Sequence, residues 1–340
     1  MTEDAYARAG VSQGHADAAV ASLVSALAVA APRESRQVLP SGHYANVVRL
    51  DDRMGIALST DGVGTKLVLA EQLGRWDTVG IDCVAMNVND VVCVGAEPLA
   101  MVDYLAVDRA DAEIAGAIGT GLGRGAELAG IEVVGGELAQ LGEIINGLDL
   151  AGACFGLVAL DSLVTGASIE PGDPVIGLPS SGLHSNGYTL ARSALAEIQF
   201  DDERLGRPLG DILLEPTEIY VRPIVELLRS EVDVRGLAHI TSGGLGNLLR
   251  LEAEVGYEID DPLPVPEIFT LIQELGGISD EEMGEVFNLG CGFCVVVAGG
   301  DEEVALERLR AHYPGAKRIG RATGETGTVG EPRPAPRSSR

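Results

Sequence analysis

A chain of 340 residues in which 46% are hydrophobic is long enough to form two domains, each with its own core. A formal net charge of −27 excludes nucleic acid as a partner, because phosphate backbones would be repelled. No apolar run reaches the roughly 20 residues of a membrane span, and no basic segment precedes the first apolar stretch. Together with five scattered cysteines, which do not suit a disulfide framework, this predicts a cytoplasmic protein without a membrane partner.

The first half of the chain alternates helical and strand-like patterns. Asp111 is a suitable N-cap for a long helix, and Gly130 is a suitable stop for it. The predicted elements are a helix over 16–31, strands over 46–50 and 55–59, helices over 66–73 and 79–94, a strand over 99–107, a helix over 111–129, and strands over 131–134 and 150–160.

The second half repeats this mixture after a turn-rich junction at 170–174. The predicted elements are strands over 175–178, 236–240 and 293–298, and helices over 188–198, 217–230, 245–254, 268–275 and 302–312. From residue 323 onward Gly, Pro, Ser and Arg dominate without apolar periodicity. We therefore expect two domains of α/β or α+β type, over 1–165 and 166–322, followed by a disordered tail over 323–340.

The segment 59–66 follows a strand and opens a helix, so its backbone N–H groups and helix dipole favour an anion. Gly62 and Gly64 allow close approach, and Thr65 opens the helix. Lys66, one of only two lysines in the chain, adds a positive charge, whereas Asp61 suits a metal that bridges phosphates. The spacing is not that of a Walker loop, and a tight turn with a surface lysine is the alternative interpretation.

Carboxylates recur in apolar or glycine-rich contexts. Helical spacing places Asp82 and Asn89 on one face with Asp90 alongside, and Glu137 follows a strand that ends at Gly136. A buried carboxylate without a cation is costly. Magnesium held by three acids, with nucleotide phosphates completing its shell, is therefore the expected solution. These acids are Asp61, Asp90 and Glu137. The alternative is that each acid is a helix cap or a turn residue.

Two further loops lie between a strand and a helix and are rich in polar side chains. Hydroxyl, amide and imidazole groups near a helix start suit a phosphorylated ligand, and we expect His184 and His239 to contact it. The predicted ligand-binding residues of these loops are Ser180, Ser181, His184, Ser185, Asn186, Thr241, Gly243, Gly244 and Asn247.

Taken together, the motifs resemble those of the phosphoribosylformylglycinamidine cyclo-ligase family, also called AIR synthetases. The similarity runs from Tyr6 to about Arg321. It rests on Asp61-Gly-Val-Gly-Thr-Lys66, Gly80 to Asp90, Gly95-Ala-Glu-Pro98, Asp103-Tyr104, Val134-Gly-Gly-Glu137, Leu150-Ala-Gly152, Ser180 to Gly187, His239 to Gly244 and Phe287-Asn288-Leu-Gly290. The resemblance implies a homodimer. Its N-terminal domains would share a β-barrel, and its C-terminal α/β domain would pack helices on a mixed sheet.

The resemblance also implies an activity. ATP and Mg²⁺ would drive closure of formylglycinamidine ribotide to 5-aminoimidazole ribotide, with release of ADP and phosphate, in de novo purine biosynthesis. Asp61, Asp90 and Glu137 would serve the metal and nucleotide, and Lys66 the phosphates. The loops at 180–186 and 239–244 would hold the substrate and its ribose phosphate, so the catalytic candidates are Asp61, Lys66, His184 and His239.

Two departures from the family pattern leave alternatives open. Leu138 replaces a hydroxyl beside Glu137, and the segment 41–46 is altered. Either change is compatible with another ATP-using member of the superfamily, a small-molecule kinase or synthetase. A non-catalytic nucleotide-binding relative is the remaining alternative.

Overall fold

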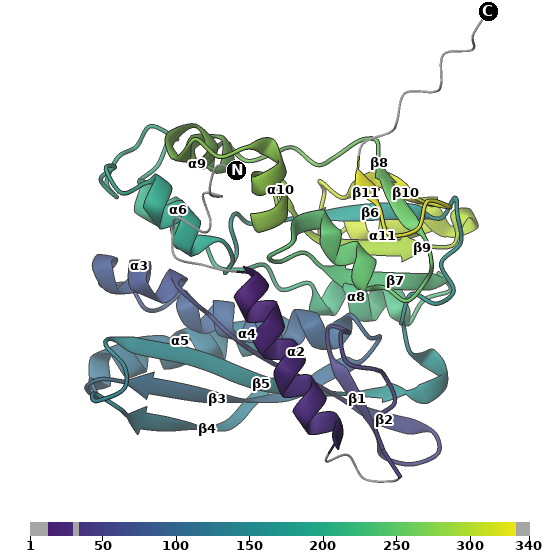
Figure 1. Ribbon diagram of the computed structural model, residues 1–340, viewed down its shortest axis with the longest axis horizontal. Coiled ribbons are helices and arrows are strands. Elements are labelled where there is room, and N and C mark those ends of the chain that lie inside the picture. The colour runs from purple at the N-terminus through teal and green to yellow at the C-terminus, as the bar shows by residue number, and fades with distance from the viewer. Residues whose placement is uncertain (1–12, 30–33, 331–340) are drawn as a thin grey trace, which may run out of the picture.

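The computed structural model describes residues 13–29 and 34–330, and its strands form two separate sheets (Figure 1). The first sheet has five strands in the order β1-β2-β5-β3-β4, and the second has six in the order β11-β8-β10-β6-β9-β7. Both sheets mix parallel and antiparallel pairs. The chain therefore has the expected two-domain organisation, with helices packed on mixed sheets.

The first half follows the predicted order of elements. Its bounds are α2 Gln13–Val29, β1 Asn46–Arg49, β2 Met54–Gly62, α3 Lys66–Leu73, α4 Val79–Val92, β3 Glu97–Val107, α5 Ala112–Ala129, β4 Glu132–Gln140, β5 Leu148–Ala159 and η1 Leu160–Ser162. The predicted ends of α5 are confirmed: the Asp111 carboxylate accepts hydrogen bonds from the N–H groups of Glu113 and Ile114, and Gly130 is left-handed at φ 77°. Strands β2 and β4 extend further than predicted and carry Asp61 and Glu137 within the sheet.

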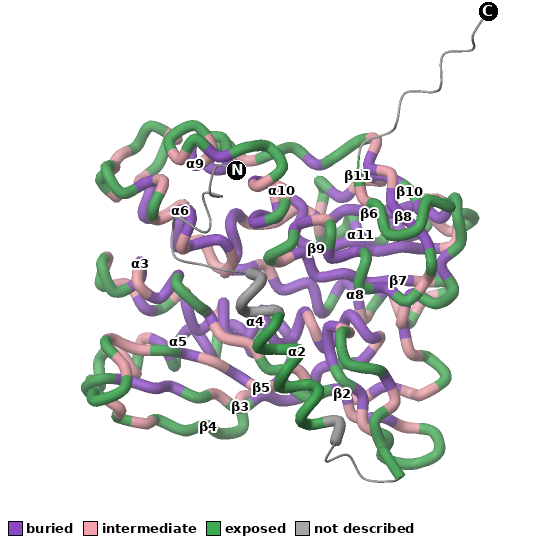
Figure 2. The backbone as a smooth tube through the Cα atoms, in the orientation of Figure 1, coloured by how far each residue is buried: buried purple, intermediate pink, exposed green. Residues whose placement is uncertain are grey.

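Helix α4 lies between the first sheet and the second half of the chain (Figure 1). All its residues except Ile81 and Asp90 are buried, and Figure 2 colours it largely as buried. Its packing against α5 is very close, since a Cβ added at Gly80 would lie 2.3 Å from the backbone nitrogen of Leu122. The core around α4 includes side chains from both halves of the chain. The two halves are therefore joined by shared apolar packing.

The opposite face of the first sheet is open and apolar. Leu58, Val102, Tyr104 and Phe155 are 38–43% exposed on strands β2, β3 and β5. Strand pairing places Leu58 beside Phe155 on this face. Helix α2 likewise exposes large apolar side chains, and it is drawn as exposed in Figure 2.

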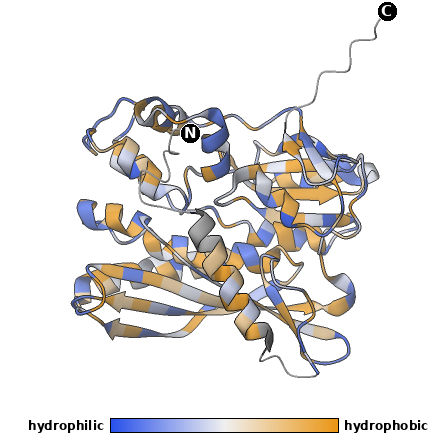
Figure 3. Cartoon of the chain, viewed as in Figure 1, coloured by the Kyte–Doolittle hydropathy of each residue, from blue (hydrophilic) through white to orange (hydrophobic). Residues whose placement is uncertain are grey.

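The second half departs more from prediction. Its bounds are β6 Pro174–Pro179, α6 Tyr188–Ala194, α7 Leu209–Leu213, α8 Val221–Leu228, β7 Val234–His239, η2 Gly244–Arg250, β8 Gly256–Ile259, α9 Glu267–Gly276, α10 Asp280–Val286, β9 Cys291–Val297, η3 Gly299–Asp301, α11 Glu302–Arg310, β10 Lys317–Thr323 and β11 Val329–Gly330. Figure 3 shows that the strands of the second sheet are largely hydrophobic.

The differences from prediction in this half concern two helices, two strands and the tail. The helix predicted over 217–230 begins only at Val221, and the one predicted over 245–254 is the 3₁₀-helix η2. Strands β8 and β10 were not predicted, because β8 has only four residues and β10 has three basic residues and a glycine among its seven. Residues 323–330, expected to be disordered, contain β11, which pairs with β8; residues 331–340 lie outside the described part of the chain. Within the described residues, no helix is long and apolar enough to cross a bilayer.

Candidate functional site

The predicted motifs meet where the two halves face each other. The end of β2 carries Asp61, α4 carries Asp90, and the end of β7 carries His239. Asp90 Oδ1 lies 2.9 Å from His239 Nδ1, so a residue from each half contributes to one pair. Ser59 Oγ lies 3.5 Å from Asp90 Oδ2, which is a long contact for a hydroxyl donor. The structure therefore brings Asp61, Asp90 and His239 together.

Asp61 is held rigidly through its backbone. Asn87 of α4 accepts the Asp61 N–H at 3.0 Å and donates to the Asp61 carbonyl at 3.1 Å. From the described residues, the Asp61 carboxylate accepts one hydrogen bond, from the adjacent Gly62 N–H at 2.7 Å. Burial raises the pKa of Asp61 to about 6, with a smaller contribution from the nearby charge of Asp90. Such a carboxylate, half-buried beside a second acid, favours a bound cation.

Lys66 does not face the phosphate loop. Its side chain is fully buried, and its Nζ lies 2.9 Å from Oδ1 and 2.8 Å from Oδ2 of Asp82. The same ammonium donates to the carbonyls of Glu215 at 2.7 Å and His184 at 3.2 Å. An ammonium has three donors, and all three are used. In this structure the Lys66 ammonium and Asp82 are thus engaged with each other and with the second half, and not with the phosphate loop as predicted.

Asn89 is also engaged in joining the two halves. Its amide donates to the Glu218 carbonyl at 2.8 Å, and its oxygen accepts the Tyr220 N–H at 3.0 Å. Thr217 donates its N–H and its hydroxyl to Asp82 Oδ1, each at 2.7 Å. The segment 215–220 thus binds the polar side chains of α4, and both polar groups of Asn89, predicted as a nucleotide ligand, are occupied by this segment. No motif in the sequence indicated this segment, since it is extended and was expected to open a helix.

Glu137 lies apart from Asp61 and Asp90. Strand pairing aligns Asp61 with Gly152, Gly152 with Asp103, and Asp103 with Gly136. Paired residues project to one face of a sheet and the next residue to the other, so Glu137 projects away from Asp61. The two are also three strand spacings apart, or about 14 Å. The predicted three-carboxylate metal site is therefore not formed within this chain. Gly136, predicted as a nucleotide contact, lies on the same distant strand as Glu137.

Leu138 has a packing role in this strand. It pairs with Leu105 on the face that carries α5, and it lines a small cavity there with Trp76 and Ile114. An apolar residue therefore suits this position, without reference to the metal site. The altered segment 41–46 contacts the second half instead: the Tyr44 hydroxyl donates to the Asn247 carbonyl at 2.8 Å, and Arg250 stacks on the Tyr44 ring at 3.9 Å.

His184 adopts a left-handed backbone, at φ 62°, which is rare for a residue with a Cβ. Its Nε2 lies 3.2 Å from the Ser181 N–H and accepts it, so the ring proton is on Nδ1. Burial lowers the pKa of His184 well below its usual value, with smaller contributions from His239 and Lys66. His184 is therefore a neutral imidazole whose buried Nδ1–H is a hydrogen-bond donor.

Most of the other polar side chains in these two loops form hydrogen bonds that hold the loops in shape. Ser180 Oγ lies 3.0 Å from both the Gly182 carbonyl and Asn288 Oδ1 and shares its one proton between them. Ser181 donates to the Pro216 carbonyl, and Ser185 pairs with Thr217. Asn247 donates to the carbonyls of Ser242 and Gly244, so it shapes the turn. Ser242 donates to Asn186 at 3.1 Å and thereby joins the loops. Gly244, at φ 52°, packs directly on the carbonyl of Gly284, and Gly243 and Thr241 complete the turn.

When only the described residues are considered, three buried side-chain atoms of these two loops lack a hydrogen-bond partner: His184 Nδ1, Asn186 Nδ2 and His239 Nε2. Unpaired buried polar atoms are costly, and they are rare in folded proteins. Their concentration in the two loops predicted to bind substrate, near Asp61 and Asp90, indicates a ligand site that the described residues alone do not complete.

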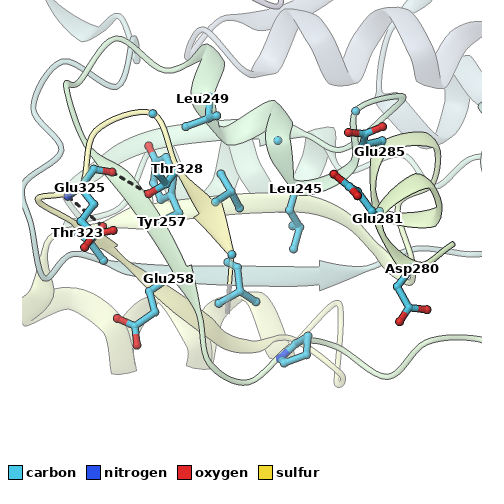
Figure 4. Close-up of a pocket in the computed structure, with 18 residues that line it drawn as sticks. Leu245, Leu249, Tyr257, Glu258, Asp280, Glu281, Glu285, Thr323, Glu325 and Thr328 are labelled. Atoms are coloured by element: carbon cyan, nitrogen blue, oxygen red, sulfur yellow. Dashed lines mark hydrogen bonds between the residues drawn. The ribbon is translucent and has the colours of Figure 1, made fainter. Parts of the chain in front are cut away.

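A larger cavity, of about 1000 Å³, lies in the second half between η2, α10 and β11 (Figure 4). It shares Gly243 with the predicted substrate residues. Its lining includes five carboxylates and no Lys or Arg; the acids are Glu258, Asp280, Glu281, Glu285 and Glu325. That charge repels phosphate, so this cavity is not the nucleotide site.

Comparisons with known proteins agree with this arrangement. Residues 42–158 match the family described as AIR synthase related protein, N-terminal domain, and residues 170–331 match its C-terminal domain. Among solved structures, the HypE–HypF complex aligns with a TM-score of 0.62 at 21% identity, covering 84% of this chain and 88% of that chain. The structure titled AaThiL complexed with AMPPCP and TMP aligns with a TM-score of 0.62 at 17% identity, covering 86% and 89%. Fold and site thus define a two-domain AIR synthase related protein.

Curated relatives narrow this class. A protein of Methanothermobacter thermautotrophicus named phosphoribosylformylglycinamidine cyclo-ligase is 51% identical over 90% of this chain and 92% of its own. A protein of the same name from Methanocaldococcus jannaschii is 45% identical over 93% and 91%. The chain belongs to the phosphoribosylformylglycinamidine cyclo-ligase family, which confirms the resemblance found in its motifs.

Proposed function

We propose that this protein closes the imidazole ring of formylglycinamidine ribotide in an ATP-dependent reaction of purine biosynthesis. The observation that carries the proposal is the set of unpaired polar atoms at His184, Asn186 and His239 beside two carboxylates. Relatives of the same architecture bear the cyclo-ligase name over nine-tenths of the chain. A cytoplasmic location, where nucleotide metabolism supplies both substrates, belongs to the proposal.

The chemistry suits a site without a protein nucleophile. The formamide oxygen of the substrate attacks the γ-phosphorus of ATP, and ADP leaves. The amidine nitrogen then attacks the activated carbon and loses a proton, and the C–O bond breaks to release phosphate with the original formyl oxygen. Positioning and charge neutralisation account for most of the acceleration of such a phosphoryl transfer.

Asp61 and Asp90 are proposed to hold Mg²⁺ together with ATP phosphates. The donor set fits the ion: both groups supply oxygen, and the pKa of Asp61 is raised by burial and, to a smaller extent, by the charge of Asp90. Among the described residues no cluster of three or more acidic, His or Cys side chains forms a site, so phosphates and water would complete the shell. The ion would neutralise charge on the transferring phosphoryl group. Glu137 is not part of this set.

The two histidines take different roles in this proposal. His184 is a neutral hydrogen-bond donor through Nδ1 and is suited to an oxygen of the ribotide. His239 has Asp90 at its Nδ1 and an unpaired Nε2, an arrangement suited to accept the proton that the amidine nitrogen loses. Ser180, Ser181, Ser185 and Asn247 are proposed to shape the loops rather than to contact substrate.

A homodimer completes the proposal. The open apolar face of the first sheet, defined by Leu58, Val102, Tyr104 and Phe155, is proposed to pack against the same face of a second copy. The large exposed side chains of this face are apolar over three adjacent strands, β2, β5 and β3. We expect Phe155→Glu to convert a dimer to a monomer in light scattering, whereas the exposed Glu127→Gln leaves its mass unchanged. A wild-type monomer would contradict the proposal.

The function is tested by incubating purified protein with formylglycinamidine ribotide, ATP and Mg²⁺ and following aminoimidazole ribotide and ADP together. Equal formation of both products is the expected result. ADP without the imidazole would identify a kinase or synthetase of the same superfamily. Neither product, with ATP still bound, would identify a non-catalytic relative.

A further inference from the structure

The Lys66–Asp82 pair connects three segments that are distant in the sequence. Lys66 opens α3 and Asp82 lies in α4, both in the first half. Their partners in the second half are the carbonyls of His184 and Glu215 and the N–H and hydroxyl of Thr217. All contacts are between 2.7 and 3.2 Å, and Lys66 and Asp82 are both completely buried. The pair therefore fixes the second half against the end of the phosphate loop.

The contact with His184 bears on the site itself. A left-handed backbone at a residue other than glycine is strained and persists only where its surroundings hold it. Three contacts do so here. The carbonyl of His184 accepts from Lys66, its Nε2 accepts from Ser181, and its ring packs so closely on Gly292 that a Cβ there would lie 2.5 Å from the His184 Cε1. Removal of the ammonium leaves the strained carbonyl without a donor.

We infer that Lys66 is a positioning residue: its buried ammonium, paired with Asp82, holds His184 in the left-handed conformation that presents Nδ1–H to the substrate. The inference rests on the proposed function for its kinetic consequences only. Lys66 acts through His184 and touches neither ATP nor the ribotide. The substrate most affected by its loss is therefore the ribotide and not the nucleotide.

The test compares Lys66→Met with Lys66→Met/Asp82→Leu, since the single variant leaves a buried carboxylate unpaired and the double variant does not. Asp173→Asn is the matched control, because it removes one partner of the mostly buried Arg235–Asp173 pair, which does not contact His184. For each variant we would measure the thermal midpoint, the Kd of a non-hydrolysable ATP analogue, and kcat and KM for the ribotide.

In the double variant we expect the analogue Kd to stay within about 2-fold and kcat/KM for the ribotide to fall about 100-fold, as for a displaced contact group. Asp173→Asn should lower the thermal midpoint without changing kcat/KM. A tenfold rise in the analogue Kd with ribotide KM unchanged would overturn the inference in favour of direct phosphate binding. A double variant with wild-type kcat/KM would also overturn it.

A spectroscopic readout is independent of turnover. With ¹⁵N-histidine labelling, five imidazoles are visible, and the His184 signals are assigned by their loss in His184→Gln. The wild type should show a neutral ring protonated at Nδ1, and the double variant should lose that fixed tautomer. A retained tautomer would overturn the inference. If the wild type shows the tautomer but makes no aminoimidazole ribotide, the proposed function fails while the positioning role stands.

Discussion

Two carboxylates on the same helix, Asp82 and Asp90, have different surroundings. Asp82 receives an ammonium, an N–H and a hydroxyl, and its charge is neutralised within the protein. Within the described part of the chain, Asp90 has one imidazole and one long hydroxyl contact, and its charge acts on Asp61, whose carboxylate forms no ion pair there. The comparison shows that apolar context alone does not distinguish a structural acid from a ligand-binding one. What distinguishes them is whether the chain supplies the opposite charge.

Of the variants that test this comparison, a substitution of Asp82, the acid paired with Lys66, should have the largest effect on stability. Asp82→Leu leaves the Lys66 ammonium buried without a counter-ion, and the free energy of unfolding should fall by about 3–5 kcal/mol. Urea denaturation measures it. The matched control is Glu127→Gln, which removes an exposed ion pair with Arg124 and should change nothing measurable. A loss no larger than that of the control would show that Asp82 is not a structural acid.

Substitution of Asp61, the acid without an ion pair among the described residues, should change stability in the opposite direction and raise it. Asp61→Asn removes a carboxylate that lacks a cation while keeping the oxygen that accepts the Gly62 N–H. We expect turnover to fall by about 100-fold or more, since the metal loses a ligand. The ligand-free variant should nevertheless be more stable than wild type at about pH 7. Chemical denaturation of both proteins measures the difference.

The raised pKa of Asp61 also predicts how the stability difference between wild type and Asp61→Asn changes with pH. The pKa of about 6 in the folded protein lies above the value of about 3.9 for an unfolded Asp. Between these pH values the folded protein binds more protons than the unfolded chain, so burying Asp61 lowers stability as the pH rises. The advantage of Asp61→Asn should be complete above about pH 6 and absent below about pH 4. An advantage that is constant with pH would contradict this origin.

The smallest effects should separate the two acids through their hydroxyl partners. Thr217→Val removes the hydroxyl 2.7 Å from Asp82 Oδ1 while keeping the side-chain shape, and it should destabilise by about 1.5–3 kcal/mol. Ser59→Ala removes a hydroxyl 3.5 Å from Asp90 Oδ2, and about 0.5 kcal/mol or less is expected, because the contact is too long to be strong. Equal effects in denaturation experiments would remove the distinction between the two acids.

Sequence patterns located most of the first half. Periodicity, the Asp111 cap and the Gly130 stop predicted α5, and the loop ending at Lys66 was correctly placed between a strand and a helix. In the second half, β8 and β10 were not predicted, because a four-residue strand and a strand rich in basic residues both resemble loops. The polar loops at 180–186 and 239–244 were predicted as a pair, and the contact from Ser242 to Asn186 joins them.

The sequence by itself determined which segments carry chemistry, since strand–glycine–helix junctions and acids in apolar runs are local properties. Only the tertiary structure decided what each group does. Lys66 proved to be paired inside the protein because α4 supplies Asp82 beside it, and Glu137 proved to lie on the opposite face of the sheet from Asp61. The physical reason is that the role of a charge depends on its neighbours and on the face its strand presents. Both are set by pairing between segments that are far apart in the chain.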